Sequence, residues 1–213
     1  MFDLTLTFDN GPTPGVTEKV LGILARRAIK ATFFVVGQKA AAPEGLELVH
    51  HAHAQGHWIG NHTWTHSVPF GERAEPDSAV DEILRTQRLL GELAEPRRLF
   101  RPFGGGGNLD RRLLNQPAVD HLTAGGFTCV LWNAVPRDWD DPDGWVDRAV
   151  GQCMSQSWSL MVLHDIATGA LARLEEFLDR AAAAGGRFRQ DFPEDCVPIV
   201  AGRVMRPIAD YVA

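Results

Sequence analysis

Residues 2–12 read FDLTLTFDNGP, a strand pattern followed directly by a turn pattern. Apolar and polar residues alternate up to Asp9, and this period of two predicts a strand with one polar face. Asn10, Gly11 and Pro12 are turn-forming residues. A turn explains these three residues, but it does not explain an acid on the polar face at the end of the strand.

The rest of the chain alternates between predicted strands and predicted helices. Further strands are expected at about residues 31–36, 57–60, 98–101, 127–132, 160–163 and 196–200. Helices are expected at about residues 13–28, 40–55, 80–90, 109–124, 142–157 and 171–181, the first capped by Thr13 and begun by Pro14. This alternation indicates an α/β protein with a mostly parallel sheet, and about seven strands are enough to close a small barrel.

Length and composition narrow the class of protein. The 213 residues suit a single domain spanning residues 1–213, and the net charge of −6 without a long basic run argues against nucleic acid as a partner. No stretch has the apolar length of a membrane span, so no membrane partner is expected. The three scattered cysteines indicate reduced core thiols. The start of the chain lacks the pattern of a signal peptide, which favours a cytoplasmic location, although a trimmed leader would leave the same sequence.

Four more polar signatures stand at or near predicted strand ends. They read NHTWTH at residues 61–66, RPFG at 101–104, RDW at 137–139 and LHD at 163–165. Because chemistry gathers at the carboxyl ends of strands in parallel barrels, the polar side chains of these signatures are expected to converge with Asp9. A carboxylate, spaced histidines, an arginine and a further histidine are the inventory of a metal-assisted hydrolase with a separate base and acid.

His62 and His66 are four residues apart, so one turn of helix would place both rings on one side. Two imidazoles arranged in this way can bind one metal ion. The pair alone is more typical of solvated or capping histidines, and a metal site needs a third protein ligand from elsewhere in the chain. The corner formed by Asp9 and Asn10 is the natural donor.

The remaining signatures have simpler interpretations as well. His164 could be a core histidine with one hydrogen bond, and Asp165 could cap the following helix. Residues 137–139 could form a surface turn. The convergence expected at the strand ends favours a role in proton transfer for His164, and the flat ring of Trp139 would suit a sugar face.

With these motifs in this order, the chain resembles the polysaccharide deacetylase family, also called the NodB homology domain or carbohydrate esterase family 4. Residues 29–35, IKATFFV, also match the second strand of the family, and the resemblance covers nearly the whole chain. It implies a distorted, incomplete (β/α) barrel of about seven parallel strands. It also implies a hydrolase of non-peptide carbon–nitrogen bonds that deacetylates N-acetylated sugars or polysaccharides with a divalent metal, most commonly zinc.

The resemblance also implies roles for individual residues. Asp9 matches the general base, His164 the general acid, and Asp138 the carboxylate that orients and charges the acid. Arg101 belongs to the motif whose adjoining backbone helps to hold the oxyanion. The positions that match metal ligands are His62, His66 and Asn10, and those that match substrate-binding positions are Phe103, Gly104, Trp139 and Val162.

Three positions depart from the family pattern. Asn10 stands where the family has a metal-binding aspartate, and an amide oxygen holds a divalent cation less well than a carboxylate does. Phe103 and Gly104 replace the usual proline and tyrosine, and Val135 stands where a further aspartate is usual. The base Asp9 and the acid His164 are both retained.

Two rival hypotheses remain open at this stage. Some relatives hydrolyse small cyclic amides or ureides on the same fold, so the partner is expected to be either an acetylated carbohydrate or a small amide. A non-catalytic, carbohydrate-binding barrel is the other alternative, and Asn10 and Val135 are its only support. Nothing in the sequence fixes the oligomeric state.

Overall fold

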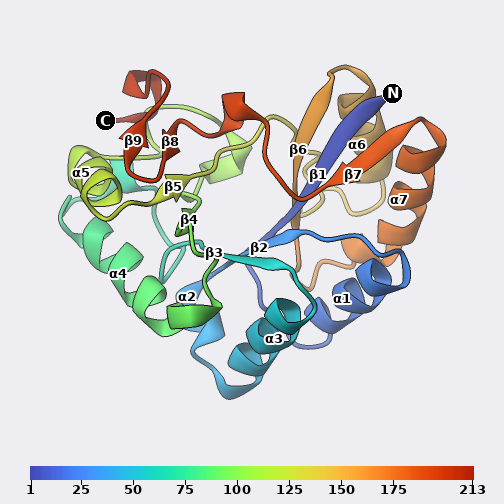
Figure 1. The fold of residues 1–213 in the computed structure, drawn as a ribbon, viewed down its shortest axis with the longest axis horizontal. Coiled ribbons are helices and arrows are strands. Elements are labelled where there is room, and N and C mark those ends of the chain that lie inside the picture. Colours follow the sequence, from blue (N-terminus) through green and yellow to red (C-terminus); the bar gives the residue numbers. More distant parts are fainter.

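The computed structural model describes residues 1–213 and contains a curved nine-stranded sheet with helices around it (Figure 1). The strands are β1 (Phe2–Asp9), β2 (Thr32–Val35), β3 (Trp58–Asn61), β4 (Leu99–Phe100), β5 (Thr128–Cys129), β6 (Trp158–His164), β7 (Gly186–Arg189), β8 (Ile199–Val200) and β9 (Arg203–Val204). The helices are α1 (Thr17–Arg26), α2 (Gly37–Ala40), α3 (Pro43–Ala54), α4 (Ser78–Leu90), α5 (Gln116–Ala124), α6 (Trp145–Met154) and α7 (Leu174–Ala183).

Strands β1 to β7 run parallel, and β1 pairs with three of them, β2, β6 and β7. The path through the sheet is β6-β1-β2-β3-β4-β5-β8-β9, and β7 pairs with the first half of β1. The expected strand at 196–200 shortens to β8, which pairs antiparallel with β5. The parallel strand β7 is absent from the sequence prediction, because it carries no buried apolar run.

The sheet curls into a barrel that is closed at only one point. Beyond β5 the chain returns to β6, where Ala134 and Met161 form an isolated parallel bridge. Val162 N–H donates to the carbonyl oxygen of Ala134 at 2.9 Å. A single bridge in place of a full strand pair makes the barrel distorted and incomplete, which confirms the expected fold class.

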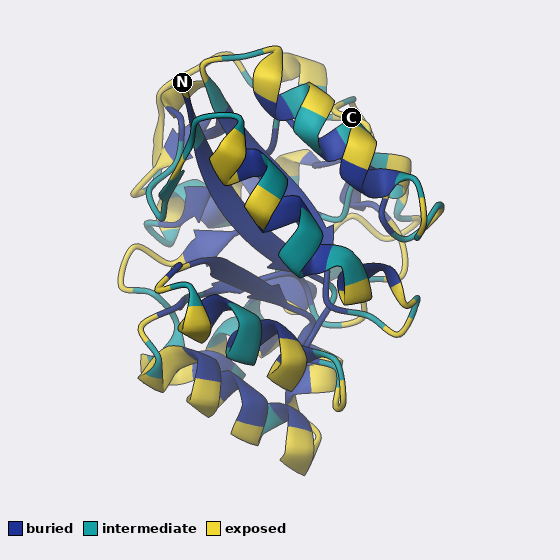
Figure 2. Cartoon of the chain, turned by 90° about the vertical axis from the view of Figure 1, so that its right-hand side faces the viewer, coloured by how far each residue is buried: buried dark blue, intermediate teal, exposed yellow.

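The two faces of β1 are both buried, but one packs against helices and the other lines the interior of the barrel. Leu4, Leu6 and Phe8 are fully buried and share one core cluster with residues of α1, α6 and α7. Figure 2 shows the corresponding buried stripes on the helices, with their exposed residues turned outward. On the other face of β1, Thr7 and Asp9 are also buried. Alternation along the strand directs these side chains into the barrel, so the predicted polar face lines its interior.

Helix α1 begins later than the sequence predicted. Thr13 and Pro14 do not cap it, because Gly15 has a positive φ of 78° and turns the chain before the helix starts. The Thr13 carbonyl oxygen accepts from the N–H groups of Val16 and Thr17, and α1 starts at Thr17. The strand expected at 127–132 is likewise reduced to β5, since the chain beyond it turns toward β6.

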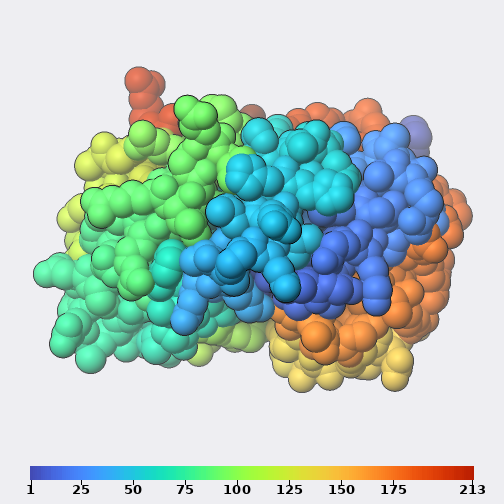
Figure 3. Space-filling view, turned by 90° about the horizontal axis from the view of Figure 1, so that it is seen from below, coloured from blue at the N-terminus to red at the C-terminus, as the bar shows by residue number.

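The helices α1, α3 and α4 lie side by side on one face of the molecule, in the order in which they occur in the chain (Figure 3).

None of the helices combines the length and the apolar character that crossing a membrane would require. All three cysteines are buried and unpaired, as expected for core thiols.

The close packing inside the barrel can be tested at a glycine. A Cβ at Gly60 of β3 would lie 2.5 Å from the ring of Phe34, so we expect Gly60→Ala to lower the free energy of unfolding by about 1–3 kcal/mol. Gly151 of α6 has no atom within 4 Å of such a Cβ, so Gly151→Ala should raise it by about 0.5–1 kcal/mol. Urea unfolding of both variants measures the difference. Equal stabilities would show that Phe34 gives way.

Candidate active site

The predicted site residues gather at the carboxyl ends of the parallel strands. A cavity of about 310 Å³ opens there, and nine of the predicted residues line it. They are Asp9, Asn10, His62, His66, Phe103, Gly104, Trp139, Val162 and His164. Arg101 and Asp138 do not reach the cavity; both are fully buried next to residues that do.

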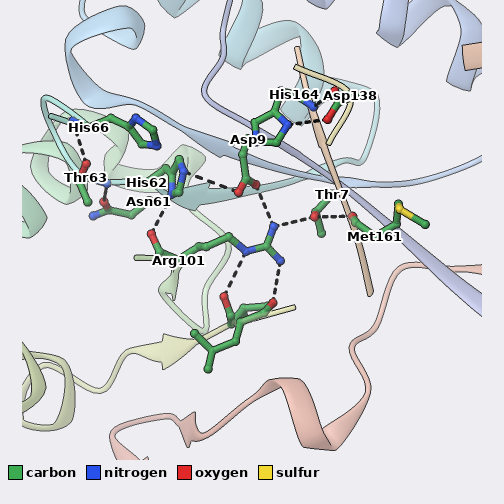
Figure 4. A network of polar contacts seen from close by, with 12 residues as sticks. Thr7, Asp9, Asn61, His62, Thr63, His66, Arg101, Asp138, Met161 and His164 are labelled. Carbon is green, nitrogen blue, oxygen red and sulfur yellow. Dashed lines mark hydrogen bonds and ion pairs between the residues drawn. The ribbon is translucent and has the colours of Figure 1, made fainter. Parts of the chain in front are cut away.

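Arg101 lies inside the barrel and uses its guanidinium to hold Asp9 (Figure 4). Its Nη1 donates to Asp9 Oδ1 at 2.8 Å and to Thr7 Oγ1 at 2.6 Å. Nε and Nη2 donate to the carbonyl oxygens of Val130 and Leu131 at 3.2 and 3.0 Å. Arg101 therefore acts on the cavity through the carboxylate of Asp9.

His62 presents an unprotonated nitrogen to Asp9. Its Nδ1 lies 2.8 Å from the carbonyl oxygen of Arg101, and because a carbonyl can only accept, Nδ1 carries the proton. Burial lowers the pKa of His62 to about 3, so the ring is neutral near pH 7. Its Nε2 lone pair then lies 3.6 Å from Asp9 Oδ2. Two acceptor atoms that face each other repel, and a cation or a proton donor bound between them would relieve this repulsion.

The two histidines meet through a loop. The prediction of a helical turn is wrong: residues 62–66 follow β3 without helical structure, and Thr63 and His66 have positive φ values of 67° and 52°. Asn61 Oδ1 accepts from Thr63 N–H at 3.0 Å, and Thr63 Oγ1 accepts from His66 N–H at 3.1 Å. This folding still brings the imidazole centroids of His62 and His66 to 4.7 Å.

The donor atoms around His62 fit a divalent cation. Burial lowers the pKa of His66 to about 3, which leaves a second neutral imidazole. Asn10 lines the same cavity, and its Oδ1 is buried without a hydrogen-bond donor. No group of three His, Cys, Asp or Glu side chains is placed to hold a metal, and the amide oxygen of Asn10 is a further donor atom at the same cavity. Imidazole and oxygen donors suit zinc, but this set carries no negative charge.

His164 is paired with a buried carboxylate, which confirms the predicted hydrogen bond. Its Nδ1 lies 2.8 Å from Asp138 Oδ1, and its backbone N–H donates to Asp138 Oδ2 at 2.9 Å. Burial opposes the charged imidazolium, but the hydrogen bond and negative charge of Asp138 prevail and raise the pKa of His164. With Nδ1 bound to Asp138, Nε2 is the nitrogen left for the cavity. The ring of Trp139 packs edge-on at a centroid distance of 4.6 Å.

Three aromatic side chains, Phe103, Trp132 and Trp139, line part of the cavity. Phe103 packs on the ring of His66 with centroids 3.9 Å apart. A Cβ at Gly104 would lie 2.4 Å from Trp132, so the glycine lets the chain pass directly against this ring. Trp132 in turn donates from Nε1 to the carbonyl oxygen of Gly107 at 3.0 Å. Phe103 and Gly104 thus form the wall without a hydroxyl group.

Some residues near the site have roles that the sequence did not reveal. Asp165 does not cap a helix, since α7 begins only at Leu174; it is buried and accepts from Thr17 Oγ1 at 2.5 Å. Thr7 supports Arg101, and Glu82 binds the histidine loop. A usable signal existed for Glu82, because it is an acid on the buried stripe of α4.

Comparison with known proteins gives consistent matches. The family model described as polysaccharide deacetylase matches residues 3–118. A chitooligosaccharide deacetylase of Bradyrhizobium sp. (strain ANU 289) is 34% identical over 165 residues, 75% of this chain and 69% of its own length. A peptidoglycan-N-acetylglucosamine deacetylase of Bacillus cereus is 29% identical over 87% of this chain and 84% of its own. The structure of a family 4 carbohydrate esterase from Streptomyces lividans in complex with acetate superposes with a TM-score of 0.74, at 28% identity, over 92% of this chain and 96% of that chain.

The pairing of Asp138 with His164 predicts a change in titration. In Asp138→Asn the charge that raises the pKa of His164 is lost while burial remains, so we expect this pKa to fall from above the ordinary value of 6.5 to below it. An NMR pH titration of the ring protons measures this shift. Asp140→Asn, which alters an exposed partner of Arg137, should leave it unchanged. A His164 pKa unaffected by Asp138→Asn would contradict the assignment.

Proposed function

The chain belongs to the polysaccharide deacetylase family, and on this basis we propose that it hydrolyses the acetamide bond of N-acetylated sugars. The products are acetate and a free amine on the sugar. The relatives named above, which are deacetylases of chitooligosaccharides and of peptidoglycan N-acetylglucosamine, support this substrate class.

One observation carries the proposal: the cavity holds a carboxylate and an imidazole with partners of opposite charge. Asp9 and His164 are direct neighbours in the register of β1 and β6. Asp9 is paired with the cation Arg101, and His164 with the anion Asp138. Such environments suit a base and an acid working in one site at the same pH.

In the proposed reaction Asp9 accepts a proton from a water molecule, whose oxygen attacks the acetyl carbonyl carbon. His164 then donates its Nε2 proton to the sugar nitrogen while the carbon–nitrogen bond breaks. The family is generally divalent-metal dependent, and a cation held by His62, His66 and Asn10 would polarise the acetyl carbonyl. We propose zinc, because imidazole nitrogens are among its preferred ligands.

The aromatic wall supports recognition of a sugar. Phe103 beside His66 and Trp139 beside His164 offer flat apolar surfaces, and Val162 would supply an apolar contact for the acetyl methyl. In this scheme Arg101 is a positioning residue for Asp9, since it does not line the cavity.

Acetate release from N-acetylglucosamine oligomers, measured with added zinc or cobalt, tests the proposal. His164→Gln removes the proton donor and should lower kcat by about 10²–10⁴-fold. His53→Gln, an exposed histidine on α3, should match the unchanged protein. Hydrolysis of small cyclic amides alone would favour the rival substrate class. No hydrolysis by metal-loaded protein would favour a non-catalytic barrel.

The neutral ligand set predicts weak metal binding. Asn10→Asp adds a full charge to the proposed site and should tighten zinc binding by at least about tenfold, or 1.4 kcal/mol. Gln116→Glu adds the same charge on α5 outside the cavity and should not change the affinity. Calorimetric titration of the three proteins decides the matter. Equal affinities for the unchanged protein and Asn10→Asp would mean that residue 10 is not a ligand.

A further inference from the structure

Helix α4 carries a buried carboxylate, Glu82, whose hydrogen bonds go to the histidine loop of residues 62–66. Its side chain is 8% exposed. Its Oε2 accepts from the backbone N–H groups of Trp64 and Thr65 at 2.9 and 2.8 Å. Its Oε1 accepts from Thr65 Oγ1 at 2.8 Å and lies 3.3 Å from Arg73 Nη2. A single carboxylate thus binds the loop at two consecutive residues between the two histidines.

The loop needs such support because of its backbone conformation. Thr63 and His66 are both in the left-handed region, which costs roughly 1–2 kcal/mol for a residue with a Cβ. Strained conformations of this kind persist only where the surroundings over-determine them. Hydrogen bonds from backbone N–H groups to a carboxylate are charge-assisted and stronger than neutral ones.

The residue after Glu82 holds the other side of Thr63. The carbonyl oxygen of Ile83 accepts from Asn61 Nδ2 at 2.9 Å, and Asn61 Oδ1 accepts from Thr63 N–H at 3.0 Å. Glu82 and Ile83 therefore fix the chain before and after Thr63 from one helical platform. His62 has a further anchor, since its ring is bound to the carbonyl oxygen of Arg101. No protein hydrogen bond holds the ring of His66, so its placement depends on the loop backbone and on packing with Phe103.

We propose that Glu82 is a positioning residue that presents His66 to the cavity by fixing the backbone of Trp64 and Thr65. Glu82 does not line the cavity and acts only through the loop. The consequence for metal binding rests on the proposed function, in which His66 is a ligand. The consequence for the loop backbone holds with or without a metal.

The test compares Glu82→Gln with Glu92→Gln, which makes the same change at an exposed residue that has no side-chain partner just after α4. A glutamine could keep its amide oxygen on the two backbone N–H groups, but it loses the charge that strengthens these bonds, and its nitrogen end would then face the guanidinium of Arg73. In metal-free Glu82→Gln we expect hydrogen exchange at the Trp64 and Thr65 amides to accelerate by at least about tenfold, which corresponds to 1.4 kcal/mol. Calorimetry should show zinc binding weakened by a similar factor. Glu92→Gln should match the unchanged protein in both measurements.

Unchanged exchange at the two amides overturns the proposal, and so does faster exchange with unchanged zinc affinity. If Glu82→Gln does not fold, Glu82→Asp replaces it: this variant keeps the charge facing Arg73, but its carboxylate is one methylene too short for the loop, so the same changes are expected. If the unchanged protein binds no zinc, the proposed metal site fails, and the exchange measurement alone then decides whether Glu82 positions the loop.

Discussion

The buried ion pair between Arg101 and Asp9 organises the interior of the barrel below the cavity. A fully buried charge costs several kcal/mol unless it is paired and its remaining donors are satisfied. Arg101 meets this demand with Asp9, Thr7 and the backbone beyond β5, at Val130 and Leu131. The guanidinium therefore links the first strand to the chain just beyond β5, where the sheet lacks a complete strand pair. The same ion pair fixes the carboxylate of Asp9 at the cavity.

A second buried ion pair, between His164 and Asp138, stands beside the pair of Asp9 and Arg101. Asp9 and His164 are register partners on neighbouring strands, and each is paired with a group of opposite charge, Asp9 with Arg101 and His164 with Asp138. Asp9 and His164 are thus each held by a fully buried partner that does not line the cavity. His62 follows the same design, because the backbone carbonyl of Arg101 fixes its tautomer. Three residues at the cavity therefore take their orientation from Arg101 or Asp138.

The sequence predicts the fold and the convergence of the site residues because both follow from local patterns and a topological rule. Alternation at residues 2–9 gives β1, and the carboxyl ends of parallel strands meet at one edge. The conformation of residues 62–66 could not be predicted in this way, because a spacing of four favours a helix and the actual loop is set by hydrogen bonds to Glu82, 17 and 18 residues away. The start of α1 was missed for a related reason: the turn at Gly15 overrides the capping pattern of Thr13 and Pro14.

In the proposed site, Asn10 would affect the chemistry of the reaction as well as the binding of the metal. With an aspartate at this position, a bound cation would lose part of its charge to its ligand, whereas an amide leaves that charge largely uncompensated. Asp9 would then be the carboxylate nearest to the cation, since its Oδ2 lies 3.6 Å from His62 Nε2. Compared with an aspartate at this position, Asn10 would thus weaken the binding of the metal, but the bound metal would polarise the acetyl carbonyl more strongly. Arg101 holds the other oxygen of Asp9, which would limit movement of the carboxylate toward such a cation and keep it available to accept a proton.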